Sequence, residues 1–423
     1  MRIAIIGSGI AGNVAARGLH RDHDITVFEA ASHIGGHTHT HDIEIGGERH
    51  QIDTGFIVFN DWTYPNFIKL LEEIGVEAQP SAMSFSVRNE TSGLEYNGTT
   101  LDTLFAQRRN LLNPAFYRLL AAIMRFNREA PRLLEDGGEL TLGEYLRQRR
   151  YPRIFIDNYL LPMGAAIWST DPERMLGFPA RFFVRFFHNH GMLSVDARPQ
   201  WRAIRGGSAR YVEKLVAPFR RHIRLNAAVE TVLRSRGRVL VKVRDAAPET
   251  FDQVFFACHS DQALRLLGDA SPLEREVLGA IAYQRNEVIL HTDCSILPRA
   301  RRAWAAWNYH VLPQDGTQVA LTYNMNILQS LHSRHTFCVT LNRGEAIAPD
   351  SIIKRLSYDH PLFTPAAVAA QQRQHEINGV NGSYFCGAYW RFGFHEDGVV
   401  SALNALQHFE HNAHAQRDLS RVA

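Results

Sequence analysis

The sequence predicts an α/β protein, in which a Rossmann-type dinucleotide-binding domain is combined with a discontinuous α+β substrate domain. Residues 3–6 form a short continuous apolar run, which is typical of a strand buried on both faces of a parallel sheet. A glycine-rich loop at residues 7–12 follows directly and leads into a helix that runs to Leu19. A second strand at residues 25–28 then ends on Glu29, which lies about twenty residues past the loop.

The residues of this loop match the chemistry of a dinucleotide. Gly7 permits a tight turn, Gly9 permits close approach of the backbone to a pyrophosphate, and Gly12 permits close packing of helix on strand. The helix N-terminus offers free N–H groups and the positive end of its dipole to the phosphate. Glu29 can accept hydrogen bonds from ribose hydroxyls. Because the chain has a single such fingerprint, an NAD enzyme and a flavoprotein without its own nicotinamide site both remain open.

Composition narrows the class of protein. With 423 residues, 45% hydrophobic and 21% charged, the chain suits two interleaved domains of an ordinary globular protein. No apolar run reaches the roughly eighteen residues of a membrane-spanning helix, and no signal peptide is expected, because Met1 leads straight into a strand. A formal charge of +3 does not indicate nucleic-acid binding. Four scattered cysteines favour reduced thiols over disulfides or zinc, so we expect a cytoplasmic protein.

Four further segments resemble the flavin amine oxidase superfamily. They are residues 30–40, which contain Gly35-Gly36, residues 53–56 (Asp-Thr-Gly-Phe), residues 384–388 and residues 393–400. The resemblance implies that Gly-Gly lies against the pyrophosphate of FAD and that residues 53–56 pass beside the flavin ring. It also implies that the helix after residue 393 directs its N-terminus at the flavin N1/O2 edge, where a helix N-terminus stabilises the anion of reduced flavin.

In detail the chain looks most similar to a bacterial subgroup of NAD/FAD-binding, amine-oxidase-like proteins linked to cyclopropane and furan fatty acid modification. Six segments carry this resemblance: 35–40, 53–60, 162–169, 186–191, 290–293 and 393–398. The fingerprint and the resemblance together imply FAD contacts at Gly7, Ser8, Gly9, Gly12, Glu29, Ala30, Gly35, Gly36, His37, Gly55, Phe56, Val229, Gly387, Asp397, Gly398 and Val399.

The implied FAD domain is of the glutathione-reductase-like type and is discontinuous. It comprises residues 1–80, 200–275 and 376–423, while residues 81–199 and 276–375 form the substrate domain. Within these segments we expect mainly helices over 81–199, a helix over 211–219, a strand over 223–233 that passes the adenine, and a buried parallel strand over 252–257. Residues 276–375 should supply strands of the substrate domain, and residues 380–415 the closing strand and helix.

Two positions depart from the superfamily pattern. The arginine that commonly follows Gly-Gly is replaced by His37, which leaves its phosphate contact in doubt. The lysine that amine oxidases place near flavin N5 is missing from the strand that should carry it, residues 287–291. The missing lysine weakens the case for an amine oxidase that uses oxygen.

The predicted substrate side is aromatic. Residues 181–188 combine phenylalanines at helical spacing with Arg181 and Arg185. Most aromatic side chains of this kind belong to a core. The functional alternative is an apolar cavity with these arginines near a phospholipid or carboxylate head group, which would also give peripheral contact with a membrane.

Histidines supply most of the remaining candidates for site residues. His37, His39 and His41 alternate and would share one face of a strand, but no carboxylate or cysteine at matching spacing favours a metal, so flavin or phosphate contacts are the better interpretation. Cys386 could form a flavin thioether, although a buried strand residue is favoured. The acid/base candidates, each of which could equally be structural, are His190, His291, Tyr309 and His395.

These features favour an FAD-dependent oxidoreductase, a dehydrogenase or desaturase that takes a hydride from an apolar substrate, a lipid acyl chain, onto flavin N5. Two alternatives are an isomerase of polyunsaturated fatty acids, which needs no external electron acceptor, and a flavin amine oxidase. A different class, the lipid-binding chaperones of prenylated GTPases, shares the fold without redox chemistry. Glu29 and the helix that starts near Glu396 argue against it, since a protein that does not use flavin does not need them.

Overall fold

A parallel five-stranded sheet forms one end of the molecule. The computed structural model describes residues 1–135, 140–194, 196–235, 237–313 and 319–422. The strand order is β10-β2-β1-β14-β20, and Ile3 of the central strand pairs with Ile25 on one side and Gln253 on the other. The strands are β1 (Arg2–Ile6), β2 (Asp24–Phe28), β10 (Ile223–Arg224), β14 (Gln253–Phe256) and β20 (Ser383–Phe385).

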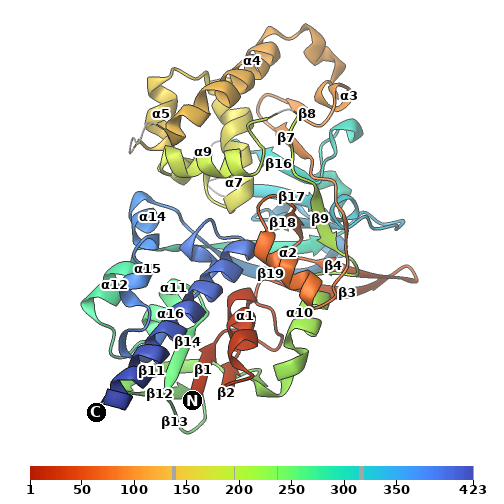
Figure 1. The fold of residues 1–423 in the computed structure, drawn as a ribbon. Helices are drawn as coiled ribbons and strands as arrows, with labels where there is room; N and C mark the ends of the chain where they lie inside the picture. The colour runs from red at the N-terminus through yellow and green to blue at the C-terminus, as the bar shows by residue number, and fades with distance from the viewer. Residues whose placement is uncertain (136–139, 195, 236, 314–318, 423) are drawn as a thin grey trace.

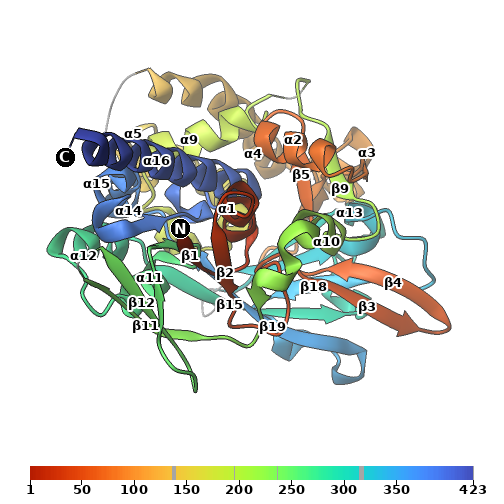
Figure 2. The same ribbon diagram turned by 60° about the horizontal axis from the view of Figure 1, so that its bottom comes forward.

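Both faces of this sheet are covered, which explains why its strands are apolar throughout. On one face, helices α1 (Ile10–Leu19), α10 (Ala209–Val216) and α16 (His395–Val422) pack against Ile3 and Ile5. On the other face, Ala4 and Ile6 contact the antiparallel sheet of β11 (Val229–Ser235), β12 (Arg238–Val243) and β13 (Glu249–Phe251). Figure 2 shows this layering, with α1 and α16 on one side of the sheet and β11 and β12 on the other.

Two element predictions in this region need correction. The strand predicted over 223–233 is broken into β10 and β11, which belong to different sheets, because Asn226 adopts a left-handed conformation with φ of 52° and turns the chain between them. The helix predicted over 211–219 ends at Val216 and continues as a 3-10 turn over Ala217–His222, since Pro218 cannot donate the next helical hydrogen bond.

A seven-stranded sheet forms the second layer, in the order β19-β15-β18-β17-β16-β7-β8. All its pairs are antiparallel except β16 with β7. The strands of this sheet are β7 (Phe85–Asn89), β8 (Glu95–Asn97), β15 (Tyr283–His291), β16 (Trp307–Val311), β17 (Ala320–Asn324), β18 (Cys338–Leu341) and β19 (Ile352–Pro361). The described residues also form two smaller sheets. One contains β5 (Val58–Asn60), β9 (Trp201–Ile204) and β6 (Ala78–Pro80), and the other is the hairpin of β3 (Thr40–Ile45) and β4 (Glu48–Asp53).

A helical lobe lies at the end of the molecule opposite to the parallel sheet (Figure 1). It comprises α3 (Leu101–Leu104), α4 (Pro114–Glu129), α5 (Leu142–Gln148), α6 (Arg153–Phe155), α7 (Leu161–Trp168), α8 (Pro172–Met175) and α9 (Ala180–Asn189). The remaining helices are α2 (Pro65–Glu73), α11 (Ser260–Leu266), α12 (Pro272–Gly279), α13 (Met325–Leu328), α14 (Pro365–Gln371) and α15 (Gln374–Ile377).

The core of this lobe contains the phenylalanines of α9. Phe182, Phe183, Phe186 and Phe187 are all buried in it, and they pack on helices of the lobe. These phenylalanines are therefore core residues, the interpretation that their sequence favoured, while Arg181 and Arg185 are exposed. The contact of these arginines with a head group stays a prediction. No helix within the described residues is both long and apolar enough to cross a bilayer.

The α/β fold class with its Rossmann-type parallel sheet is confirmed. The parallel sheet takes its strands from residues 2–28, 223–224, 253–256 and 383–385, and the seven-stranded sheet takes its strands from residues 85–97 and 283–361. The domain boundaries themselves stay predictions. The arrangement brings the carboxyl ends of β1, β2, β14 and β20 together, the edge at which open α/β sheets bind ligands.

Candidate functional site

A cavity of about 640 Å³ begins at this edge of the parallel sheet. It runs from Phe28 and Val229 past the glycine loop to residues 387–395, and it is closed by strands β15 and β19 of the large sheet. Its volume lies within the range of small-molecule and cofactor sites. Segments far apart in the sequence, such as residues 7–11, 35–37 and 54–58, therefore line one continuous space.

The three glycines of the loop have different surroundings. A Cβ on Gly7, whose φ is +103°, would lie 2.8 Å from the Ala257 carbonyl oxygen, and a Cβ on Gly12 would lie 2.0 Å from that of Gly7. These two glycines are required by the packing of the loop itself. Gly9 differs, because a Cβ there would meet no atom within 4 Å and the residue lines the cavity. The space beside Gly9 is thus open to a ligand, as close approach of a pyrophosphate requires.

Glu29 holds the start of the loop to the end of β2. Its carboxylate accepts hydrogen bonds from the backbone N–H of Ser8 at 2.9 Å, from the Ser8 hydroxyl at 2.6 Å and from the backbone N–H of Ala31 at 2.8 Å. Glu29 and Ala30 both line the cavity. The carboxylate is thereby fixed at the position predicted for contact with a ribose.

The second glycine segment lies against the first. The Gly35 N–H donates to the Ser8 carbonyl at 3.1 Å, and a Cβ on Gly36 would lie 3.1 Å from the Gly9 Cα. Gly55 is equally constrained, since its Cβ would lie 2.0 Å from the His37 carbonyl oxygen. The three glycine-containing segments are therefore packed on one another through the backbone, with no room for side chains between them.

Buried Asp53 fixes the segment that carries Gly55 and Phe56. It accepts hydrogen bonds from the Ser208 N–H at 2.9 Å, from the Thr40 hydroxyl at 2.5 Å and from the Gln329 side-chain amide at 3.1 Å. Burial raises the pKa of Asp53 to about 6, although the hydrogen bonds from Thr40 and Ser208 act in the opposite direction. The residue connects β4, the start of α10 and the end of α13 behind the cavity.

The N-terminus of α16 closes the other end of the cavity. His395, its first residue, contacts the Tyr211 hydroxyl at 2.9 Å and the Thr38 hydroxyl at 3.0 Å through Nε2, and its ring stacks on Phe56 at 3.5 Å between centroids. Burial lowers the pKa of His395 well below its usual value. The imidazole is therefore neutral, and its Nε2 interacts with the protein.

Three predicted cofactor residues of this helix, and Gly12, lie behind the cavity wall. Asp397 accepts hydrogen bonds from the N–H groups of Phe392 at 3.2 Å and Phe394 at 2.9 Å, and burial raises its pKa to about 7. Gly12, Asp397, Gly398 and Val399 do not line the cavity. The predicted residues that do line it are Gly7, Ser8, Gly9, Glu29, Ala30, Gly35, Gly36, His37, Gly55, Phe56, Val229 and Gly387.

Of the four acid/base candidates, the structure places only His395 in the wall of the cavity. His190 caps α9, where its Nδ1 contacts the Phe186 carbonyl at 2.9 Å and its Nε2 the Thr63 hydroxyl at 3.1 Å. His291 lies at the end of β15 with Nε2 2.7 Å from the Thr340 hydroxyl. Tyr309 is buried among apolar residues of α7 and β17. Because His190, His291 and Tyr309 are held in packed protein away from the cavity, the structure gives them structural contacts.

The histidine series at 37–41 does not share one face, because β3 begins only at Thr40. The His39 ring stacks on His33 and lies beside His41, with centroids 4.0 Å apart in both cases. The His37 ring instead lies near His259 and His360. Within the described residues no group of three or more histidine, cysteine or acidic side chains is arranged to hold a metal ion.

Cys386 is fully buried among the core residues beside the parallel sheet and does not line the cavity. Burial raises the pKa of its thiol. These surroundings are those of a core residue, the interpretation that its sequence context favoured.

The sequence did not single out His360 and Tyr358, which both line the cavity from β19. Their spacing, Tyr-x-His just before Pro361, places both on one face of a strand. This alternation is the signal that could have identified them. The ring of His37 lies near both, at 5.1 Å from Tyr358 and 5.7 Å from His360.

The tautomer of His360 follows from two asparagines. The Glu287 backbone N–H can only donate, and it donates to Asn342 Oδ1 at 2.8 Å, so Asn342 Nδ2 donates to Asn286 Oδ1 at 2.7 Å. Asn286 must then present its Nδ2 to His360 Nδ1, which accepts at 2.9 Å. Burial lowers the pKa of His360 to about 3. The neutral imidazole therefore carries its proton on Nε2.

The comparison with models of protein families shows the family to which the chain belongs. Residues 10–298 match the model of the flavin containing amine oxidoreductases, which is more than half of the chain. The chain belongs to this family. The flavin amine oxidoreductase is thus an FAD-dependent enzyme, and FAD is its cofactor.

Solved structures of low sequence identity share its fold. Cyclohexylamine oxidase from Brevibacterium oxydans IH-35A is 15% identical with a TM-score of 0.70, over 97% of this chain and 99% of that one. The CLA-producing fatty acid isomerase from P. acnes is also 15% identical, with a TM-score of 0.67 over 96% and 98% of the two chains. Putrescine oxidase bound to putrescine is 13% identical with a TM-score of 0.67, over 96% and 99%. A search of curated protein sequences gave no match.

The cavity fits FAD. The open space beside Gly9 would admit the pyrophosphate, Glu29 would bind the ribose, and the residues from Gly387 to His395 would face the isoalloxazine. His395, the first residue of α16, lines the cavity there, so the positive dipole end of this helix lies at the same end of the cavity.

Proposed function

We propose that this flavin amine oxidoreductase is a dehydrogenase or desaturase of an apolar substrate, a lipid acyl chain. The observation that supports the proposal is the composition of the cavity beyond the residues assigned to FAD. Among the described residues, no lysine lines the cavity and its only carboxylates are Glu29 and Asp359. The apolar and aromatic side chains of this part are Ile57, Val58, Tyr64, Ile167, Trp168, Val288, Trp307, Tyr323, Leu341, Tyr358, Phe363, Tyr389, Phe392 and Phe394.

Such a wall binds a hydrocarbon by burying it from water. Among the described residues, Arg265 is the one arginine that lines the cavity. FAD, when bound, supplies the acceptor for a hydride. The side chains of this chain orient the substrate and exclude water, while the Nε2–H of His360 is a hydrogen-bond donor in the same wall. A donor there is suited to an ester or carbonyl oxygen of the substrate rather than to the removal of a proton.

The experiment that tests the proposal is anaerobic mixing of the yellow, purified protein with candidate substrates. Phospholipids with methylated or unsaturated acyl chains are expected to bleach the flavin absorbance, and simple amines are not. Bleaching by amines alone would contradict the proposal. A colourless protein that takes up no FAD would contradict the family's cofactor chemistry as well.

Amine oxidation is the second candidate, favoured by the family and by the amine oxidases among the structural neighbours. Aromatic rings such as Tyr358 and Tyr389 can bind an ammonium group through cation–π interactions, so an aromatic wall alone does not separate the two substrates. An isomerase is the third candidate, favoured by the fatty acid isomerase among the neighbours. Product formed from a polyunsaturated fatty acid with no electron acceptor present would identify it.

One prediction concerns the tautomer of His360. Replacing Asn286 by aspartate is expected to raise the pKa of His360 by about two units or more, because a carboxylate beside Nδ1 favours the imidazolium ion. The rate of flavin reduction should then acquire a new titration between about pH 5 and pH 7. Stopped-flow absorbance across this range measures it. The double variant Asn286→Asp/His360→Phe is the control, and a titration that persists in it would exclude His360 as its source.

A further inference from the structure

The helical lobe exposes large apolar side chains along one edge. Eleven large hydrophobic residues of the described chain are exposed, and five of them lie between residues 101 and 124. Scattered single apolar residues on a surface are ordinary, whereas a contiguous group indicates an interaction site. The five are Leu101 (76% exposed), Leu111 (47%), Leu112 (90%), Tyr117 (48%) and Met124 (57%), and we call them the α4 face.

Helix α4 has two apolar sides. One side buries Phe116, Leu119 and Phe126 in the core of the lobe. Tyr117 and Met124, seven residues apart, share the opposite side. The Tyr117 hydroxyl donates to the Leu111 carbonyl at 3.0 Å, and the Tyr117 ring lies 6.1 Å from that of Phe105 at the end of α3. These contacts join α3, the turn before α4 and the outer side of α4 into one surface.

The segment that carries the α4 face is basic. Residues 101–132 contain six arginines and two acidic residues, a formal charge of +4. Arg302 adds to this basic region, since its guanidinium lies 3.7 Å from Asp102 of α3. The surface that covers the α4 face is therefore expected to be negatively charged.

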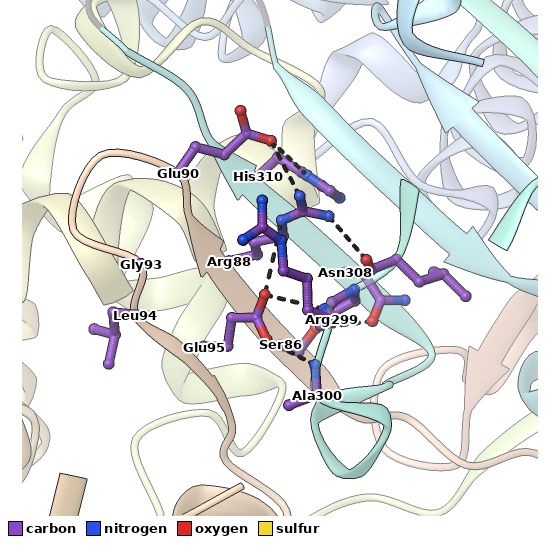
Figure 3. A network of polar contacts seen from close by, with 12 residues as sticks. Ser86, Arg88, Glu90, Gly93, Leu94, Glu95, Arg299, Ala300, Asn308 and His310 are labelled. Atoms are coloured by element: carbon purple, nitrogen blue, oxygen red, sulfur yellow. Dashed lines mark hydrogen bonds and ion pairs between the residues drawn. The ribbon is translucent and has the colours of Figure 1, made fainter. Parts of the chain in front are cut away.

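Polar contacts hold two segments that adjoin the α4 face, and Figure 3 shows the contacts of Glu95 and Arg88. The Glu95 carboxylate on β8 accepts from the N–H groups of Arg299 at 3.0 Å and Ala300 at 2.8 Å, and Arg88 lies 3.8 Å from it. Its contacts hold the loop that leads to Arg302. The Gly93 carbonyl accepts from the Arg109 guanidinium at 2.7 Å and so holds the turn that carries Leu111 and Leu112.

The inner side of α4 belongs to the core that forms one wall of the cavity. Phe116 and Phe126 lie in the same cluster as Trp168 and Phe363, which both line the cavity. The inner side of α4 and part of the cavity wall thus belong to one hydrophobic core.

We propose that the α4 face binds the surface of a bilayer that contains anionic lipids. The leucines, Tyr117 and Met124 would enter the boundary between head groups and acyl chains, while the arginines contact phosphate groups. The inference concerns binding to the membrane and stands whether or not an acyl chain is the substrate.

Flotation of the purified FAD-loaded protein with vesicles tests the proposal. The protein is expected to float with vesicles of equal parts phosphatidylglycerol and phosphatidylcholine, and not with phosphatidylcholine alone. Leu112→Glu should lower the bound fraction about tenfold, because an exposed apolar anchor is lost and a negative charge is added. Leu233→Glu, at a residue that is 43% exposed on β11, is the matched control and should leave binding unchanged.

Two results would overturn the proposal. One is that the protein does not float with anionic vesicles, or that the Leu112→Glu and Leu233→Glu variants float to the same extent. The other is sedimentation data in which Leu112→Glu converts a dimer to a monomer without affecting vesicle binding, since the α4 face would then be an interface between two copies of the chain.

Discussion

Replacing Gly9 by valine is expected to yield a folded protein that purifies without FAD. The backbone of Gly9, with φ of −67° and ψ of −178°, is compatible with valine, and a Cβ there meets no protein atom within 4 Å. The side chain would instead occupy the open space in the cavity that we assign to the pyrophosphate. We expect the affinity for FAD to fall at least about a hundredfold, which corresponds to about 2.7 kcal/mol.

Absorbance at the flavin band and titration of the apoprotein with FAD measure this loss, while urea unfolding of the apoprotein measures stability. The stability should change by less than about 1 kcal/mol. Gly98→Ala is the control, because it also adds a Cβ in open space but lies away from the cavity. If the Gly9 variant retained FAD with native affinity, the pyrophosphate could not lie beside this residue.

Lowering the pH from 7 to 5 is expected to reduce the free energy of unfolding by on the order of 5 kcal/mol. Burial lowers the pKa of His37, His190, His259 and His291 to about 4. Such a histidine is neutral in the folded protein and takes up a proton on unfolding below pH 6.5, so stability is present above this pH and is lost as the pH falls towards 4. The pKa values of His360 and His395 are lowered in the same direction.

Two buried carboxyl groups oppose this change. The pKa of Asp53 is raised to about 6 and that of Asp397 to about 7, so both bind a proton in the folded protein and stabilise it as the pH falls. Between its folded and unfolded pKa values, each group changes the free energy of unfolding by up to about 1.4 kcal/mol per pH unit. The loss of stability from the six histidines therefore exceeds the gain from the two carboxyl groups.

Urea unfolding at several pH values measures how the free energy of unfolding changes with pH. His360→Gln should reduce this pH dependence by about the contribution of one histidine. A free energy of unfolding that is constant from pH 7 to 5 would contradict the buried, neutral state of these histidines.

The dinucleotide end of the fold was predictable because its signals are local. The strand, the loop with Gly7, Gly9 and Gly12, the helix and Glu29 follow one another within thirty residues. Gly7 and Gly12 meet backbone requirements that the structure displays, whereas Gly9 leaves open space in the cavity. The return of β14 and β20 to the sheet that β1 begins was expected from the resemblance to the flavin amine oxidase superfamily rather than from these local signals.

The substrate side was harder to predict because its geometry depends on contacts between distant segments. His360 meets Asn286 only because β19 pairs with β15, and the sequence does not show this register. Isolated histidines such as His190 and His291 have the same local signature whether they cap a helix or line a cavity. The break at Asn226 was missed for a related reason, since a single left-handed residue leaves no trace in the apolar pattern around it.

The close contact between the first and last elements of the site has a consequence for biosynthesis. A Cβ on Gly398 would lie 2.7 Å from the side chain of Ile10, so the start of α16 packs directly on the start of α1. Strand β20 is likewise an edge strand of the sheet that β1 begins. The glycine loop therefore leaves the ribosome nearly four hundred residues before the helix that completes its pocket. We therefore expect FAD to be captured only after α16 has been synthesised and has packed on α1.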